Sequence, residues 1–149
     1  MRAVLLAPLV LLCACSLRVR ERADFNAALL LVQKEYPVFA RGLKSSPLAL
    51  TLPEHESIMR LVAHDRVASL IYIDRHGETR WVRETGRLMM CTWTLQTLEF
   101  ATAAPDRAVR TKAPAYARTG SGALEVAVPV VVKGKVLGAI VLQYAAQSG

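Results

Sequence analysis

Two valine-rich segments near the C-terminus constrain the fold more than any other feature of this 149-residue chain. Residues 124–132 and 135–144 both have the composition of β-strands, and only Lys133 and Gly134 separate them. Parallel strands need a crossover connection of a dozen or more residues, so these two strands must be antiparallel. Gly134 can supply the positive φ of a tight turn, which predicts a β-hairpin. Pro129 lacks a backbone N–H and is therefore expected at an edge or a bulge.

A helical pattern begins at Glu21. Apolar residues recur there at steps of three and four, which predicts a helix with one apolar face. Pro37 is expected to kink or end this helix, with Arg41–Gly42 as its latest end. The apolar face is formed by Phe25, Leu29, Val32, Tyr36 and Phe39.

A second, shorter helix is expected after a Ser/Pro linker at residues 44–50. Thr51 and Glu54 have the spacing of a capping box, with Thr51 as the N-cap and Pro53 in the first turn. This helix is predicted to bury Ile58, Leu61 and Val62.

The middle of the chain predicts a further hairpin. Residues 67–73 and 78–83 have the composition of strands, and residues 74–77 (Asp-Arg-His-Gly) that of a turn in which Asp74 binds local amides. Residues 87–100 fit a helix slightly better than a strand, and residues 101–117 are expected to form a loop. The order of elements predicts an α+β fold, in which a long N-terminal helix and short helices pack on one face of an antiparallel sheet. Residues 18–149 are expected to form one domain.

Residues 1–17 have the features of a targeting segment. A basic start precedes an uncharged run at residues 3–17, which is short for a membrane span of about 20 residues. Residues 12–16 (Leu-Cys-Ala-Cys-Ser) resemble a bacterial lipoprotein signal, with Cys15 as the lipidated residue. An uncleaved anchor or plain signal peptide and the N-terminal helix of a cytosolic protein are the alternatives. Arg18, Arg20 and Arg22 oppose export; we nevertheless expect a membrane-tethered protein on the periplasmic or extracytoplasmic side.

Charge and composition argue against several function classes. The formal charge is +7, but the basic residues are spread along the chain, so we expect no nucleic-acid binding. Neither the cysteines nor His55, His64 and His76 have metal-ligand spacing, and no cofactor motif occurs. No nucleophile, base and oxyanion-binding set can be assembled from the sequence, so an enzyme is not expected.

Two segments resemble a known family. The hairpin at residues 67–78 is similar to the first hairpin of Cache and PAS-like sensor domains, and residues 124–142 are similar to their closing hairpin. Cache domains also begin with a long helix that rises from the membrane, as residues 21–40 would here. GAF domains, which end in nearly the same pattern, are the second choice.

The resemblance implies a ligand pocket between the sheet and the irregular middle of the chain. Side chains there that could bind a small anionic or zwitterionic ligand are Trp81, Arg83, Trp93, Tyr116 and Arg118, with Arg118 the first choice. The structural alternative is that these aromatic residues pack internally and the arginines face solvent.

Three functions follow from this reading. The first is a non-catalytic extracytoplasmic sensor that relays to a separate partner protein, because the chain ends at Gly149 without an output domain. The second is a closed-pocket interaction or dimerisation domain, which includes a homodimer. The third is a cytosolic GAF- or roadblock-like adaptor, if the chain is not exported.

Overall fold

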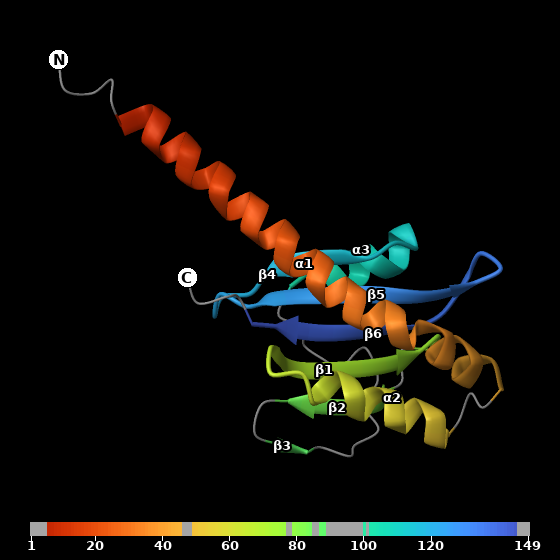
Figure 1. Ribbon diagram of the computed structural model, residues 1–149. Coiled ribbons are helices and arrows are strands. Elements are labelled where there is room, and N and C mark those ends of the chain that lie inside the picture. The colour runs from red at the N-terminus through yellow and green to blue at the C-terminus, as the bar shows by residue number, and fades with distance from the viewer. Residues whose placement is uncertain are drawn as a thin grey trace.

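The computed structural model describes residues 6–45, 49–76, 79–84, 87–88, 100 and 102–145. The six strands in this part of the chain form one sheet in the order β3-β2-β1-β6-β5-β4, and every neighbouring pair is antiparallel (Figure 1). The predicted α+β class with a long N-terminal helix is therefore confirmed. The elements are α1 (Leu6–Ser45), α2 (Leu52–Val62), β1 (Val67–Asp74), β2 (Thr79–Glu84), β3 (Arg87–Leu88), α3 (Ala104–Thr111), β4 (Ala115–Arg118), β5 (Leu124–Val132) and β6 (Lys135–Tyr144).

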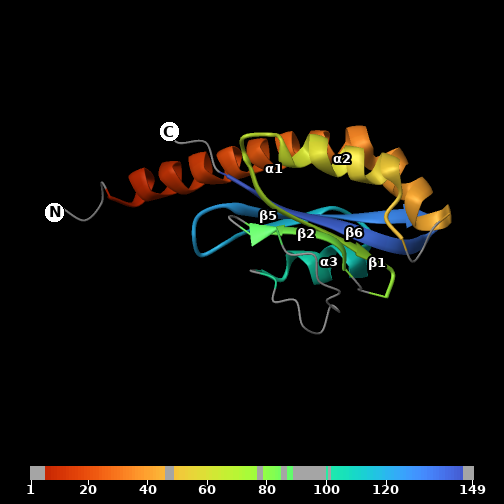
Figure 2. The same ribbon diagram turned by 90° about the horizontal axis from the view of Figure 1, so that it is seen from below.

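Helices cover both faces of the sheet. Figure 2 shows α1 and α2 on one face and α3 on the other. The two predicted helices that the structure contains, α1 and α2, pack on a single face as expected, whereas α3, which the sequence did not predict, covers the other face. The core beneath α1 and α2 is built from large side chains, which include Val32, Phe39, Ile58, Leu70, Tyr72, Val126, Val128, Val130, Ile140 and Leu142. The core beneath α3 is smaller and consists of Ala104, Ala108, Ala115, Ala127 and Val141.

The closing hairpin has the predicted strand bounds. Its turn residues Lys133 and Gly134 both have positive φ, 49° and 75° respectively. Such a two-residue turn matches the right-handed twist of the strands that it joins. The inward side chains of β5 and β6 lie on one face, as alternation along a strand requires.

Pro129 lies where β5 has no neighbour on one side among the described strands. β4 pairs with β5 only as far as Ala127, and the register of β5 with β6 shifts between Val130 and Val131. The Tyr36 hydroxyl of α1 accepts a hydrogen bond from the backbone N–H of Val131 (2.7 Å). The missing neighbour and the register shift agree with the prediction that Pro129 lies at an edge or a bulge. The Tyr36 hydroxyl gives the backbone N–H of Val131, which lies at the register shift, a hydrogen-bond partner.

Helix α1 is longer than expected at both ends. It begins at Leu6, so the apolar segment and the first helix of the domain are continuous, and it runs through Pro37 to Ser45. The prediction that the helix ends by Arg41–Gly42 is wrong. Phe39 and Leu43, beyond the proline, are buried in the core, and this packing stabilises the last turns despite the lost hydrogen bond.

Helix α2 begins as the capping box predicts. The Thr51 hydroxyl accepts a bond from the Glu54 N–H, and the Glu54 carboxylate accepts one from the Thr51 N–H (2.7 Å). Ile58, Leu61 and Val62 are buried as predicted.

The segment around residues 87–117 differs most from expectation. Arg87–Leu88 is the strand β3 instead of part of a helix, and residues 89–99 lie outside the described part. The predicted loop at residues 101–117 contains α3 and β4. Pro105 stands in the first turn of α3, where its missing N–H has no cost. The Thr102 hydroxyl accepts a bond from the Ala104 N–H and donates one to the buried carboxylate of Glu125 (2.6 Å), which fixes the chain ahead of α3.

Candidate functional site

Arg118 and Tyr116 connect β4 to α1. The Arg118 guanidinium forms an ion pair with the Glu21 carboxylate (2.7 Å), and the Tyr116 ring stacks on Phe25 with 4.5 Å between ring centroids. Both side chains therefore help to hold the edge strand against the long helix. Neither lines the pocket described below.

The other predicted site residues are described only in part. Arg83 and Trp81 lie on β2, but their side chains fall outside the described part, as does all of Trp93. Cys15 lies in α1, and its side chain is also outside the described part. Within the described residues, no helix is long and apolar enough to cross a membrane. The described part also contains no group of three His, Cys, Asp or Glu side chains placed to hold a metal ion.

Three chain segments meet at one end of the sheet. β1 ends at Asp74, which pairs with Gly138 near the start of β6. The turn after β1 and the turn between β5 and β6 therefore lie at the same end, and the last turn of α1 reaches this end as well (Figure 1). Antiparallel pairing of β1 with β6 thus brings together residues that are far apart in the sequence.

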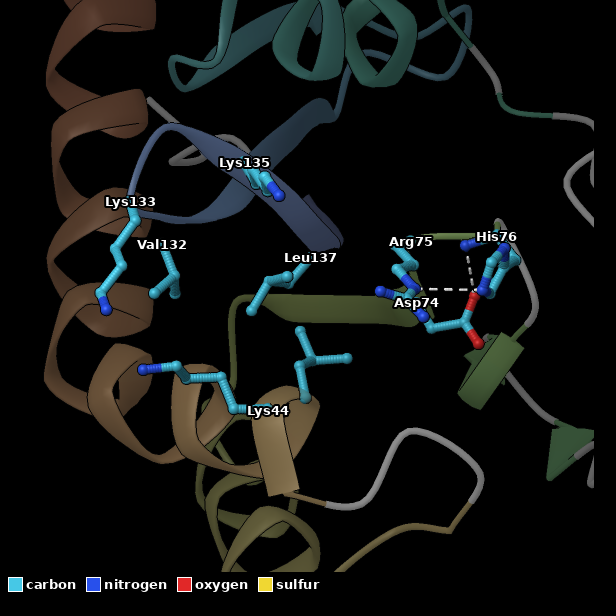
Figure 3. Close-up of a pocket in the computed structure, with 9 residues that line it drawn as sticks. Lys44, Asp74, Arg75, His76, Val132, Lys133, Lys135 and Leu137 are labelled. Carbon is cyan, nitrogen blue, oxygen red and sulfur yellow. Dashed lines mark hydrogen bonds between the residues drawn. The ribbon is translucent and has the colours of Figure 1, made fainter.

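A pocket of about 390 Å³ lies between these three segments (Figure 3). We call it the hairpin-end pocket. Its volume falls within the usual range for small-molecule sites, about 300–1,000 Å³. It is lined by Leu43, Lys44, Asp74, Arg75, His76, Val132, Lys133, Lys135 and Leu137.

A glycine on β6 allows the apolar floor of the pocket to form. Leu43 of α1 is buried, and Val132 and Leu137 are half-buried. A Cβ atom built on Gly138 would lie 2.3 Å from the carbonyl oxygen of Ile73 and 2.9 Å from a methyl group of Leu43. Any side chain at this position would therefore push β1 and the end of α1 away from β6.

The charges around the floor are mostly positive. Four cationic side chains line the pocket against one carboxylate, that of Asp74. This carboxylate accepts a hydrogen bond from the His76 backbone N–H (2.8 Å), which confirms the predicted role of Asp74 in its turn. The Arg75 Nε donates a bond to the His76 Nε2 (3.1 Å), so this imidazole nitrogen acts as an acceptor. A surplus of cations beside an apolar floor favours an anion that also has an apolar part.

A buried polar cluster holds α2 against the sheet. The Glu54 carboxylate is fully buried, accepts a bond from the Tyr72 hydroxyl (2.6 Å) and pairs with Arg80 (3.0 Å). Arg80 also donates to the carbonyl of Ala49 (2.7 Å). Burial, and then the bond to Glu54, raise the pKa of Tyr72, so its hydroxyl stays protonated and continues to donate.

A second polar cluster ties α2 to α1. The Glu35 carboxylate accepts two bonds from the Arg60 guanidinium (both 2.9 Å) and one from the buried Ser57 hydroxyl (2.6 Å). The hydrogen bond from Arg60 lowers the pKa of Glu35, although partial burial opposes this shift. The two clusters thus hold α2 in place, the first against the sheet and the second against α1.

Local sequence patterns do not point to the residues of the hairpin-end pocket. By these patterns Lys44 belongs to a linker, Arg75 and His76 to a turn, and Lys133 to a hairpin connection. A signal was present, because the turn after β1 and the tip of the closing hairpin both carry cations. Using it would have required the pairing of β1 with β6, which local patterns do not reveal.

No known protein-family model matches the chain, and no curated protein is significantly similar to it in sequence.

Proposed function

We propose that this protein is a non-catalytic ligand-sensing module of the Cache or PAS-like type. In this proposal it is tethered to a membrane by its N-terminal segment on the extracytoplasmic side. It binds a small anionic ligand in the hairpin-end pocket and passes occupancy to a separate partner protein.

The positive hairpin-end pocket is the observation that carries the proposal. Lys44, Arg75, Lys133 and Lys135 come from three separate segments and are all exposed at the pocket. Lysine at the end of a helix complements the helix dipole, and lysine at a hairpin tip aids solubility. Each of these explanations accounts for one cation at a time. A binding site explains why all four lie around one apolar pocket whose volume suits a small ligand.

The position of the pocket fits a tethered sensor. α1 is one continuous helix of 40 residues, and its N-terminal part projects beyond the sheet (Figure 1). The pocket contains Leu43 and Lys44 from the opposite end of the same helix. If the N-terminal segment is held at a membrane, the pocket lies at the distal end and is open to soluble ligands. A shift of the last turn of α1 on ligand binding would then reach the membrane end through a single element.

The hairpin-end pocket is better supported as a ligand site than Arg118 and Tyr116. Arg118 and Tyr116 are engaged by Glu21 and Phe25 respectively, so binding a ligand there would first break contacts between β4 and α1. Among the cations of the hairpin-end pocket, Arg75 is bonded to the His76 imidazole, but both residues are exposed on the turn after β1, so a ligand there would break no contact between β4 and α1.

Thermal unfolding in the presence of small organic anions tests the proposal. A ligand that binds only the folded state stabilises it by RT ln(1+[L]/Kd), so binding raises the melting temperature. We expect the shift in the native protein and its loss in a Lys44→Gln/Lys135→Gln variant. Arg110→Gln is the matched control, since Arg110 is an exposed cation on α3, on the other face of the sheet. A shift that the double variant keeps, or no shift with any anion, contradicts the proposal.

A second candidate function is interaction with another copy of this chain. Leu17, Val19 and Leu30 are exposed on α1, with 51%, 69% and 59% of their surface accessible. Exposed apolar side chains on a projecting helix favour helix–helix association. Sedimentation velocity of the native protein and a Val19→Ser/Leu30→Ser variant tests this, because the variant should be monomeric where the native protein is dimeric.

A further inference from the structure

Three of the four cations of the hairpin-end pocket, Lys44, Lys133 and Arg75, stand on two sides of its apolar floor, and Lys135 lies between the two sides. In Figure 3 the ammonium groups of Lys44 and Lys133 lie toward one side of Leu137, and Arg75 lies on the opposite side, beside Asp74 and His76. The two cationic sides are contributed by different segments: the end of α1 and the β5–β6 turn on one side, and the β1–β2 turn on the other.

This division determines what kind of anion matches the pocket. A compact ion with one anionic group can reach the cations of only one side at a time. A linear ion with an anionic group at each end can reach both sides at once. Its middle then covers Leu137 and the neighbouring Val132, which favours an apolar spacer over a polar one.

We propose that the hairpin-end pocket selects a linear dianion, two anionic groups joined by a short apolar chain, over a monoanion of the same length. This inference rests on the proposed function of the same pocket and adds the class of ligand to it. Lys44 and Lys133 bind one end group, and Arg75 binds the other. A guanidinium matches a planar carboxylate through two parallel hydrogen bonds, so a carboxylate is the end group that suits Arg75 best.

The aliphatic dicarboxylates adipate, suberate and sebacate are suitable probes, with the monocarboxylates hexanoate, octanoate and decanoate as their length-matched controls. Calorimetric titration of the native protein should show at least tenfold tighter binding for the best dicarboxylate than for the monocarboxylate of equal length. Affinity should also change with chain length and pass through an optimum, because a fixed distance separates the two cationic sides. On the short side of the optimum, each added methylene should gain up to about fourfold.

Single substitutions test the two ends separately. Lys44→Gln and Arg75→Gln should each reduce the affinity for the dicarboxylate to about the affinity for the monocarboxylate. Each substitution should reduce the affinity for the monocarboxylate by a smaller factor. Arg110→Gln on α3 should leave both affinities unchanged. The three substituted residues, Lys44, Arg75 and Arg110, are exposed, and an unchanged melting temperature without ligand would show that each variant folds.

The possible outcomes distinguish a failure of the linear-dianion inference from a failure of the proposed function. Equal binding of monocarboxylate and dicarboxylate, or binding of inorganic phosphate as tight as that of the best dicarboxylate, overturns the linear-dianion inference and leaves an anion-binding pocket. Absence of binding by every anion tested overturns both.

Discussion

Replacing Gly42 by alanine is the most discriminating test of the packing that positions α1. Alanine in place of glycine inside a helix normally stabilises a protein, by up to about 1 kcal/mol. Here the structure predicts the opposite sign. A Cβ atom on Gly42 would lie 2.0 Å from Cδ and 2.2 Å from Oε1 of Glu54, well inside van der Waals contact.

The magnitude follows from what holds Glu54 in place. Its carboxylate is fully buried and is bonded to the Thr51 N–H (2.7 Å), the Tyr72 hydroxyl (2.6 Å) and the Arg80 guanidinium (3.0 Å). To make room for the new methyl group, either this carboxylate leaves its partners or α1 and α2 move apart. Breaking a buried ion pair costs about 3–5 kcal/mol, and the helix-forming preference of alanine returns up to about 1 kcal/mol. We therefore expect Gly42→Ala to lower the free energy of unfolding by about 2–4 kcal/mol.

Urea unfolding followed by far-ultraviolet circular dichroism measures this quantity. Gly120→Ala is the control, because a Cβ atom on Gly120 meets nothing within 4 Å and the substitution should change stability by less than about 0.5 kcal/mol. Glu54→Asp should restore part of the loss when combined with Gly42→Ala, since the shorter side chain leaves space for the methyl group. An increase in stability for Gly42→Ala alone would refute the close approach of α1 to Glu54.

Substitutions at three further positions test other parts of the molecule. Gly134→Val should lower the free energy of unfolding by about 1 kcal/mol or more, because Gly134 has a φ of 75°, and Gly134→Asn should cost less since asparagine tolerates this conformation. The lowered pKa of Glu35 means that its pairing with Arg60 stabilises the fold above the usual pKa of 4.5 and is lost as pH falls through the lower folded value. Urea titrations from neutral pH to well below 4.5 should thus show a steeper acid loss in the native protein than in Glu35→Gln. Cys15→Ala should abolish palmitate labelling and release the protein from the membrane fraction; unchanged membrane binding would instead indicate an uncleaved anchor.

The parts of the fold that the sequence predicted are those that local rules determine. The two-residue connection at Lys133–Gly134 leaves no topology other than a hairpin, and its strands have the predicted bounds. The capping box at Thr51 and Glu54 likewise places the start of α2, because both partners lie within one helical turn. In each case the interaction that decides the structure joins residues a few positions apart.

The predictions fail where contacts between residues far apart in the sequence override a local sequence pattern. Pro37 favours an end to α1, but burial of Phe39 and Leu43 keeps the helix intact to Ser45. α3 was missed because its buried face consists of the small residues Ala104 and Ala108, which give no amphipathic pattern of large side chains.

The candidate site could not be predicted for a related reason. Glu54 acts both as the local cap of α2 and as the partner of Tyr72 and Arg80, and only the first of these roles is visible in the sequence. Similarly, Lys44 and Arg75 each have an ordinary local explanation, at a helix end and in a turn. The pairing of Asp74 with Gly138 brings them to the same pocket, and Leu43 can pack this close to Gly138 only because Gly138 lacks a side chain. A substitution of Gly138 by alanine should therefore weaken both the sheet and anion binding, whereas Lys44→Gln should weaken binding alone. That difference distinguishes residues that shape the pocket from residues that bind the ligand.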